Sequence, residues 1–144
     1  MPAMPDWLYW ALLSALFAAM TAIFAKIGLD GINSDLATLI RTFFIFFVLA
    51  GFVYFTKTWS NIWEITPKSW AFLFLSAIAT GASWVCYFRA LKIGDATKVA
   101  PVDKLSLVLV AIFAVIFLGE RPGLYNWLGI LLIVIGVILI GIKI

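Results

Sequence analysis

The sequence predicts an all-α integral membrane protein of five transmembrane helices, and its composition and its apolar runs carry the prediction. Of its 144 residues, 65 % are hydrophobic and 12 % are charged, with a mean hydropathy of +1.15. Soluble domains are about half apolar and about a quarter charged. A helix needs about 20 apolar residues to cross roughly 30 Å of hydrocarbon. Runs of that length are predicted at residues 7–27, 37–55, 70–91, 99–118 and 124–142 of one membrane domain, 1–144.

Turn residues and interfacial aromatic residues mark the ends of these five predicted helices. Trp7 opens the first, and Lys26 with Gly28 closes it. Turn residues at 31–34, 94–95 and 121–123 separate the helices that follow. The longest connection, 56–69, carries Trp59 and Trp63, which suit a membrane–water interface. Strands of a membrane barrel would alternate apolar and polar residues, whereas runs such as 43–47 and 130–135 are continuously apolar.

The composition excludes several function classes. The chain has no histidine and one cysteine, Cys86, so the usual histidine and cysteine metal or nucleophile sites are missing. We therefore predict no enzyme, no metal and no cofactor. The net charge of +3 is spread over the helix ends, which predicts no nucleic-acid partner. The first helix lacks a basic n-region before it and is expected to be retained rather than cleaved.

Polar side chains lie on one face of the first, third and fourth predicted helices, at spacings of three and four residues. We predict that these helices line a substrate cavity, while the second and fifth face lipid or another subunit. The aromatic rings of the third helix would meet an apolar or cationic part of the substrate. In the alternative interpretation, the hydroxyls only bond their own backbone or join helices. The predicted substrate-binding residues are Trp10, Ser14, Thr21, Thr80, Trp84, Tyr87, Asp103 and Ser106.

Charges at membrane depth are costly, roughly 2.5–3.5 kcal/mol each at a helix centre, and are candidates for function. Asp103 and Lys104, near the start of the fourth helix, are predicted to set the field at one mouth of the cavity. Arg41 and Glu120 are the other candidates for charge coupling. The alternative is structural: long side chains reach the interface from a helix end, and Asp103 complements the dipole at a helix start.

The lysine and arginine distribution hardly decides the orientation of the chain. Five spans place the termini on opposite sides. One side carries three basic residues, Lys57, Lys68 and Arg121, and the other carries seven, namely Lys26, Arg41, Arg89, Lys92, Lys98, Lys104 and Lys143. Without Arg41, Arg89 and Lys104, which are set apart as candidates for function inside the helices, the balance is four against three. Such a chain could insert both ways, and inverted repeats are common in transporters. We therefore predict an antiparallel homodimer, with Gly129 and Gly136 packing against a partner helix.

Four segments carry a resemblance to a known family. They are ALKIGDAT at 90–97, VAPV at 99–102, FLGER at 117–121 and GILLIVIGVILIG at 129–141. They resemble the second half of an EamA domain, and the Gly-Glu pair at 119–120 is the most specific part. EamA domains belong to the drug/metabolite transporter superfamily, whose members mostly carry two domains in ten helices. The chain resembles the single-domain, five-helix branch, which implies half of a ten-helix body completed by dimerisation.

The resemblance implies a secondary transporter that exports a small metabolite by alternating access. It also implies the inner membrane of a bacterium or archaeon. Small multidrug resistance relatives exchange protons through a carboxylate in the first helix, but no carboxylate lies between Trp7 and Lys26. Coupling to protons would then need Asp103 or Glu120. Two alternatives stay open: a flippase for an amphipathic lipid-linked substrate, and a non-transporting subunit of a larger membrane complex.

Overall fold

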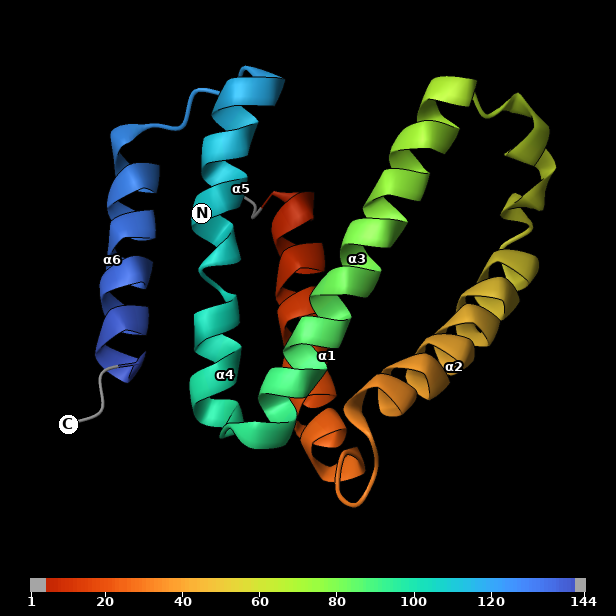
Figure 1. The fold of residues 1–144 in the computed structure, drawn as a ribbon. Coiled ribbons are helices and arrows are strands. Elements are labelled where there is room, and N and C mark those ends of the chain that lie inside the picture. Colours follow the sequence, from red (N-terminus) through yellow and green to blue (C-terminus); the bar gives the residue numbers. More distant parts are fainter. Residues whose placement is uncertain (1–4, 142–144) are drawn as a thin grey trace. The chain divides into compact units, whose positions relative to one another are not determined.

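The computed structural model describes residues 5–141, apart from the side chains at positions 60 and 61. Within this range the chain has no strand, and five helical segments are long and apolar enough to span a membrane. The predicted fold class is confirmed. The predicted end of the fifth span at residue 142 lies outside the described residues. The elements are, in order, α1 (Asp6–Gly28), α2 (Ser34–Phe55), η1 (Thr58–Glu64), α3 (Pro67–Ile93), α4 (Ala96–Asp103), α5 (Ser106–Phe113), η2 (Ala114–Leu118) and α6 (Leu124–Gly141) (Figure 1).

The chain divides into two compact units. One unit is the continuous segment Ile23–Ile93, which holds the end of α1, all of α2 and η1, and α3. The other unit consists of the segments on either side of it, with the first part of α1 and the elements from α4 to α6. Helix α1 contributes to both, because its residues up to Ala22 belong to the second unit.

Side-chain caps fix where α2 and α3 begin. The Asn33 side chain accepts hydrogen bonds from the backbone N–H groups of Asp35 (2.8 Å) and Leu36 (3.2 Å), two of the donors that a helix start leaves without partners. Thr66 does the same for Ser69 (3.2 Å). Pro67 takes the first helical position, where a missing N–H has no cost. Both helices therefore begin about one turn before the predicted spans.

Helices α2 and α3 pack together at one end of their unit. In Figure 1 the start of α2 lies beside the end of α3, and the two helices diverge toward η1, which connects their other ends. The buried side chains of this unit gather at the packed end: Leu91 is fully buried, and Leu29, Thr38 and Phe88 are nearly so. The packed end is therefore where contacts between α2 and α3 are made.

In the other unit, the fourth span is interrupted, which the sequence analysis did not predict. It begins at Ala96 rather than near residue 99, and α4 ends at Asp103. Asp103 therefore closes a helical segment, and its predicted placement at a helix start is wrong. Pro101 lies inside α4, two residues before this end, and has no N–H to bond the turn before it. The following N–H groups of Lys104 and Leu105 bond carbonyls three residues back, a tighter turn than the α-helix.

The fourth span ends in a π-helical turn, η2, that a glycine closes. Gly119 has a φ of +68° in the left-handed region, and its N–H bonds the carbonyl of Ala114. The N–H of Glu120 bonds the same carbonyl at 3.2 Å. A residue with a Cβ is strained at such a φ, so the glycine of the Gly-Glu pair is required by the backbone. Helix α6 follows and packs against α4 and α5.

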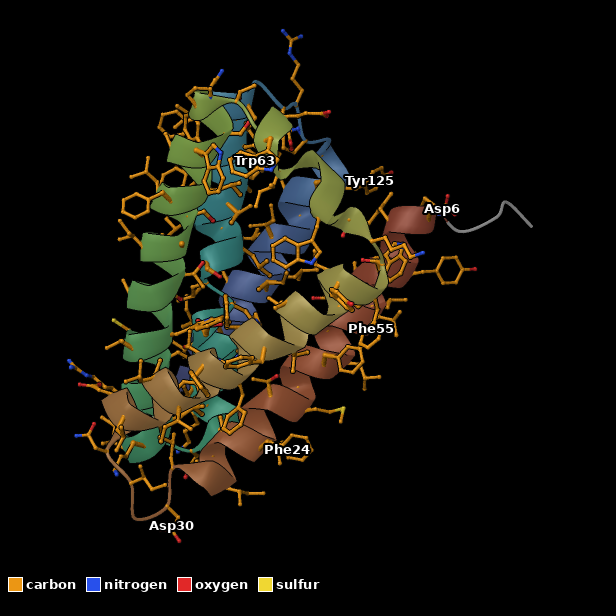
Figure 2. The ribbon with its side chains drawn as sticks, turned by 90° about the vertical axis from the view of Figure 1, so that its right-hand side faces the viewer. Asp6, Phe24, Asp30, Phe55, Trp63 and Tyr125 are labelled. Carbon is orange, nitrogen blue, oxygen red and sulfur yellow. The ribbon has the colours of Figure 1, made fainter. Side chains whose placement is uncertain are left out.

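Large aromatic side chains surround the connection between α2 and α3. Trp63 on η1 is 93 % exposed and Phe55 at the end of α2 is 83 % exposed (Figure 2). Trp59 and Trp70 are about half exposed. Tryptophan is enriched where the membrane meets water, and the loop that the sequence predicts as interfacial carries Trp59 and Trp63 on a short 3₁₀ helix.

Replacing Gly119 with alanine is expected to lower stability by about 1 kcal/mol, because the left-handed conformation at this position strains any residue with a Cβ. Denaturant unfolding of the purified protein measures the change. Gly123→Ala is the matched control, since a Cβ there meets open space and its φ is ordinary. Equal stability of Gly119→Ala and Gly123→Ala would contradict this account of the turn.

Candidate functional site

A groove between α2 and α3 is the candidate site, and all of its residues lie within one unit. Its volume is about 600 Å³, which falls in the range of about 300–1,000 Å³ for small-molecule sites. It is open along the pair of helices rather than enclosed by them. The α2–α3 groove is lined by Asp35, Thr38, Leu39, Thr42, Leu73, Ser76, Ala77, Thr80, Gly81, Trp84 and Val85.

The two walls of the groove use their hydroxyl groups differently. On α2, Thr38 donates to the carbonyl of Ser34 and Thr42 donates to the carbonyl of Thr38, both at 2.8 Å. Both hydroxyl protons are therefore used in hydrogen bonds within α2. On α3, the side-chain hydroxyls of Ser76 and Thr80 make no hydrogen bond to any residue that the structure describes. The α3 wall consequently offers two hydroxyl donors to a ligand.

Arg41 lies on the aromatic rings beside the groove. Its guanidinium carbon is 4.4 Å from the centre of the Trp84 ring and 5.3 Å from that of Phe88. A cation over an aromatic face gains about 0.5–1 kcal/mol when exposed and about 2 kcal/mol when desolvated. The Nη1 atom of Arg41 is buried and has no hydrogen-bond partner among the described residues. Arg41 borders the groove through Trp84 and does not line it.

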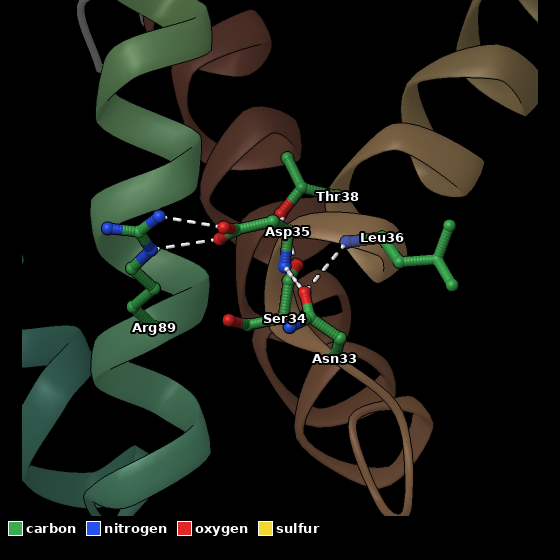
Figure 3. Close-up of polar contacts among 6 residues, drawn as sticks. All are labelled: Asn33, Ser34, Asp35, Leu36, Thr38 and Arg89. Atoms are coloured by element: carbon green, nitrogen blue, oxygen red, sulfur yellow. Dashed lines mark hydrogen bonds and ion pairs between the residues drawn. The ribbon is translucent and has the colours of Figure 1, made fainter.

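A two-point ion pair closes the packed end of the groove. Arg89 on α3 donates from Nε to Asp35 Oδ1 (2.8 Å) and from Nη2 to Asp35 Oδ2 (2.7 Å) (Figure 3). The cap from Asn33 holds the backbone N–H of Asp35 at the same point, so the carboxylate sits at the first turn of α2. Parallel paired bonds fix geometry as well as charge. The pair therefore sets the position of α2 against α3.

Two lysines add backbone contacts at this end. Lys26 at the end of α1 donates to the carbonyl of Leu91 at 2.6 Å. Lys92 donates to the carbonyl of Ile32 in the α1–α2 connection. The last carbonyls of a helix lack partners in their own helix, and Leu91 is one of the last residues of α3. The end of α1 and the α1–α2 connection are thus each bound to the end of α3.

The structure places the predicted residues unevenly. Thr80 and Trp84 line the α2–α3 groove, opposite residues of α2 that the sequence analysis assigned to lipid or to another subunit. Tyr87 lies outside the lining and interacts electrostatically with Arg41. Trp10, Ser14 and Thr21 on α1, with Asp103 and Ser106 of the fourth span, belong to the other unit. Whether these residues share a site with the groove stays a prediction.

The remaining charged candidates lie in the second unit. Asp103 pairs with Lys104 at 3.4 Å, where the fourth span is interrupted. Lys98, on the same helix, pairs instead with Asp95 at 3.5 Å. Glu120 is exposed just after η2 and has no ion-pair partner in the described part of the chain. Gly129 and Gly136 on α6 face open space, so they are available for a partner helix.

Sequence reasoning missed the α2 wall of the groove. The side chains of Asp35, Thr38 and Thr42 recur at spacings of three and four, which is the signal that was used for the other helices. This polar spacing was overlooked because the stretch after Thr42 is aliphatic and aromatic, so that the second span as a whole is strongly apolar. The Asp35–Arg89 pair was missed for another reason: 54 residues separate the partners, and no local pattern joins them.

Comparison with known proteins agrees with this architecture. The model of the EamA-like transporter family matches residues 6–142, which is nearly the whole chain. The chain belongs to the EamA-like transporter family. It is therefore a multi-pass membrane protein of a transporter family, and the resemblance noted in the sequence is confirmed.

Two relatives of this EamA-like protein are informative. A protein of Sinorhizobium sp, described as an uncharacterized transporter in the cobO 3′ region, is 58 % identical over 137 residues, 95 % of this chain and 97 % of its own length. The uncharacterized transporter YxxF of Bacillus subtilis (strain 168) is 26 % identical over 131 residues, 90 % of this chain but 40 % of its own length. No solved structure matches the chain.

The pair between Asp35 and Arg89 is expected to couple α2 to α3. Asp35→Asn and Arg89→Gln should each lower the thermal stability of the purified protein, because each leaves one charge without its partner. The double variant should lose less thermal stability than the sum of the two single losses. This shortfall should shrink in high salt, since both side chains are about half exposed.

The matched control is the same cycle on Asp95 and Lys98, a single contact at 3.5 Å between exposed side chains three residues apart. That cycle should be additive within error. Additive behaviour at Asp35 and Arg89 as well would remove the ion pair as the connection between the helices.

Proposed function

We propose that this EamA-like protein is a secondary transporter that binds a small metabolite in the α2–α3 groove and moves it by alternating access. The observation that carries the proposal is the groove itself: a mostly apolar cleft between two membrane helices, with hydroxyl groups on both walls and an arginine beside it. Polar and charged groups at membrane depth are expensive and mark substrate pathways. The packed end, closed by Asp35 and Arg89, would be the gate on one side of the substrate.

We further propose that the working unit is a homodimer, most simply an antiparallel one. The 26 % identical Bacillus transporter supports this, because the chain spans 40 % of its length and so corresponds to one part of a longer transporter. Two copies of a five-helix chain would supply the ten helices that the two-domain members carry. Gly129 and Gly136 on α6 are the proposed contact, with outward transport across the inner membrane of a bacterium or archaeon as the role.

A flippase for an amphipathic lipid-linked substrate is the second candidate. The groove favours it in one respect, because a cleft open along two membrane helices could admit a molecule from the lipid side. A non-transporting subunit is the third, and a stable dimer of the purified chain alone would count against it.

Trp84→Ala is expected to reduce transport without loss of the dimer, because it removes the aromatic part of the α3 wall and the ring beside Arg41. Metabolites released by cells that express wild type or variant would be compared by mass spectrometry, with dimer content checked by cross-linking. Trp63→Ala is the matched control, since Trp63 is 93 % exposed on η1 and outside the groove. Equal release from wild type and Trp84→Ala would remove this ring from the substrate path.

Topology tests the dimer. Single cysteines placed near each terminus, in a Cys86→Ser background that removes the exposed native thiol, would be labelled in intact cells. Each site should be reached from both sides of the membrane in comparable amounts, because the basic residues hardly favour one orientation. Labelling of each terminus from one side only would exclude the antiparallel homodimer and favour a parallel assembly or an oppositely oriented partner.

A further inference from the structure

The charges around the α2–α3 groove do not cancel. Asp35 is the one acidic residue in the lining, and both of its oxygens are taken by Arg89. Arg41 has no ion-pair partner among residues 5–141. Counting Asp35 and Arg89 as a neutral pair, the groove and its immediate neighbours carry one unbalanced positive charge, which belongs to Arg41.

Arg41 is held in place but its donors are not used up. The rings of Trp84 and Phe88 lie 4.4 and 5.3 Å from its guanidinium carbon, and a cation–π contact does not use the N–H groups as conventional hydrogen bonds do. Nη1 is buried and has no hydrogen-bond partner among the described residues. Arg41 lies seven residues after Ser34, about 10 Å along α2, and its guanidinium adjoins Trp84, which lines the groove. The groove therefore has beside it a positive charge that no described carboxylate neutralises.

The occupied aromatic face also changes what the groove favours. From the sequence, Trp84 was expected to meet an apolar or cationic part of the substrate, but Arg41 already lies over that ring. A cationic ligand next to Trp84 would meet the charge of Arg41, and like charges repel. Ser76 and Thr80 on the same wall add hydroxyl groups that can donate to an anion. Both observations favour negative charge.

We propose that the α2–α3 groove recognises an amphipathic organic anion, with Arg41 as the counter-ion of its acidic group and the apolar lining as the site of its body. Leu39 and Leu73 supply that lining. The groove follows α3 from Leu73 to Val85, a length of about 18 Å at 1.5 Å per residue. This leaves room for a body of one or two rings or a short chain. The inference names the substrate class of the proposed transporter and rests on the groove being its substrate site.

The test uses three probes of one skeleton that differ in charge: 4-phenylbutyrate, 4-phenylbutylamine and 4-phenylbutanol. Their binding to the purified protein in a non-ionic detergent would be measured by titration calorimetry against a detergent blank. Wild type should bind the carboxylate at least tenfold more tightly than the amine. Arg41→Gln should weaken carboxylate binding about tenfold or more, as expected for the loss of a charge-assisted bond.

Two further variants keep the test interpretable. Arg41→Lys retains the charge without the flat, stacking guanidinium, and should keep part of the preference for the carboxylate. Lys98→Gln removes one positive charge from the other unit and should bind as wild type does. Preference for the amine, absence of binding by wild type, or equal carboxylate binding by wild type and Arg41→Gln would each overturn the proposal.

The source of the anion and the proposed function are separated by two additional measurements. Displacement of 4-phenylbutyrate by short-chain phosphatidylglycerol would identify a lipid headgroup as the anion, whereas no displacement identifies a soluble one. Binding in detergent needs no transport. If the carboxylate binds at Arg41 but no released metabolite depends on the protein, the transporter proposal fails and the anion site stands. If the released metabolites are cations, the anion proposal fails and the transporter proposal stands.

Discussion

The ion pair between Asp35 and Arg89 is the contact on which the candidate site depends. Helices in lipid gain little from burying apolar side chains, because the lipid tails are equally apolar. Polar contacts and close packing must then decide how two helices meet. At the start of α2, the Asn33 cap positions Asp35, and Arg89 binds both of its oxygens. The groove exists because α2 and α3 are held at this end and diverge toward the other.

A charge at membrane depth has to be offset by its surroundings, and Arg41 is offset only in part. An arginine at the centre of a membrane helix costs roughly 2.5–3.5 kcal/mol on insertion scales. Stacking on Trp84 and Phe88 returns some of this. The part of this cost that stacking does not offset would be lowered by a negative charge nearby. In the proposed complex a single ionic contact would hold the anion, which leaves its release possible when the path changes.

The fourth span adds a second irregular feature, in the other unit. Interrupted helices are common in transporters, where freed backbone groups border a cavity. Here Pro101 removes one backbone donor, the following bonds tighten, and the Asp103–Lys104 pair lies at the interruption. Asp103 and Lys104, two of the charged residues singled out from the sequence, therefore lie where the backbone of this span is irregular. Gly119 then ends the span in a conformation that a Cβ would strain.

The sequence by itself determined the number, type and approximate ends of the helices. Length and hydrophobicity are local properties, and lipid leaves a lone span no other way to satisfy its backbone than a helix. The sequence also placed Thr80 and Trp84 on one face of α3, since helical periodicity is local too. Only the tertiary structure decided that this face meets α2, that Arg41 covers Trp84, and that Asp35 finds Arg89. These are contacts between distant segments, and their selection depends on packing geometry that no short window of sequence contains.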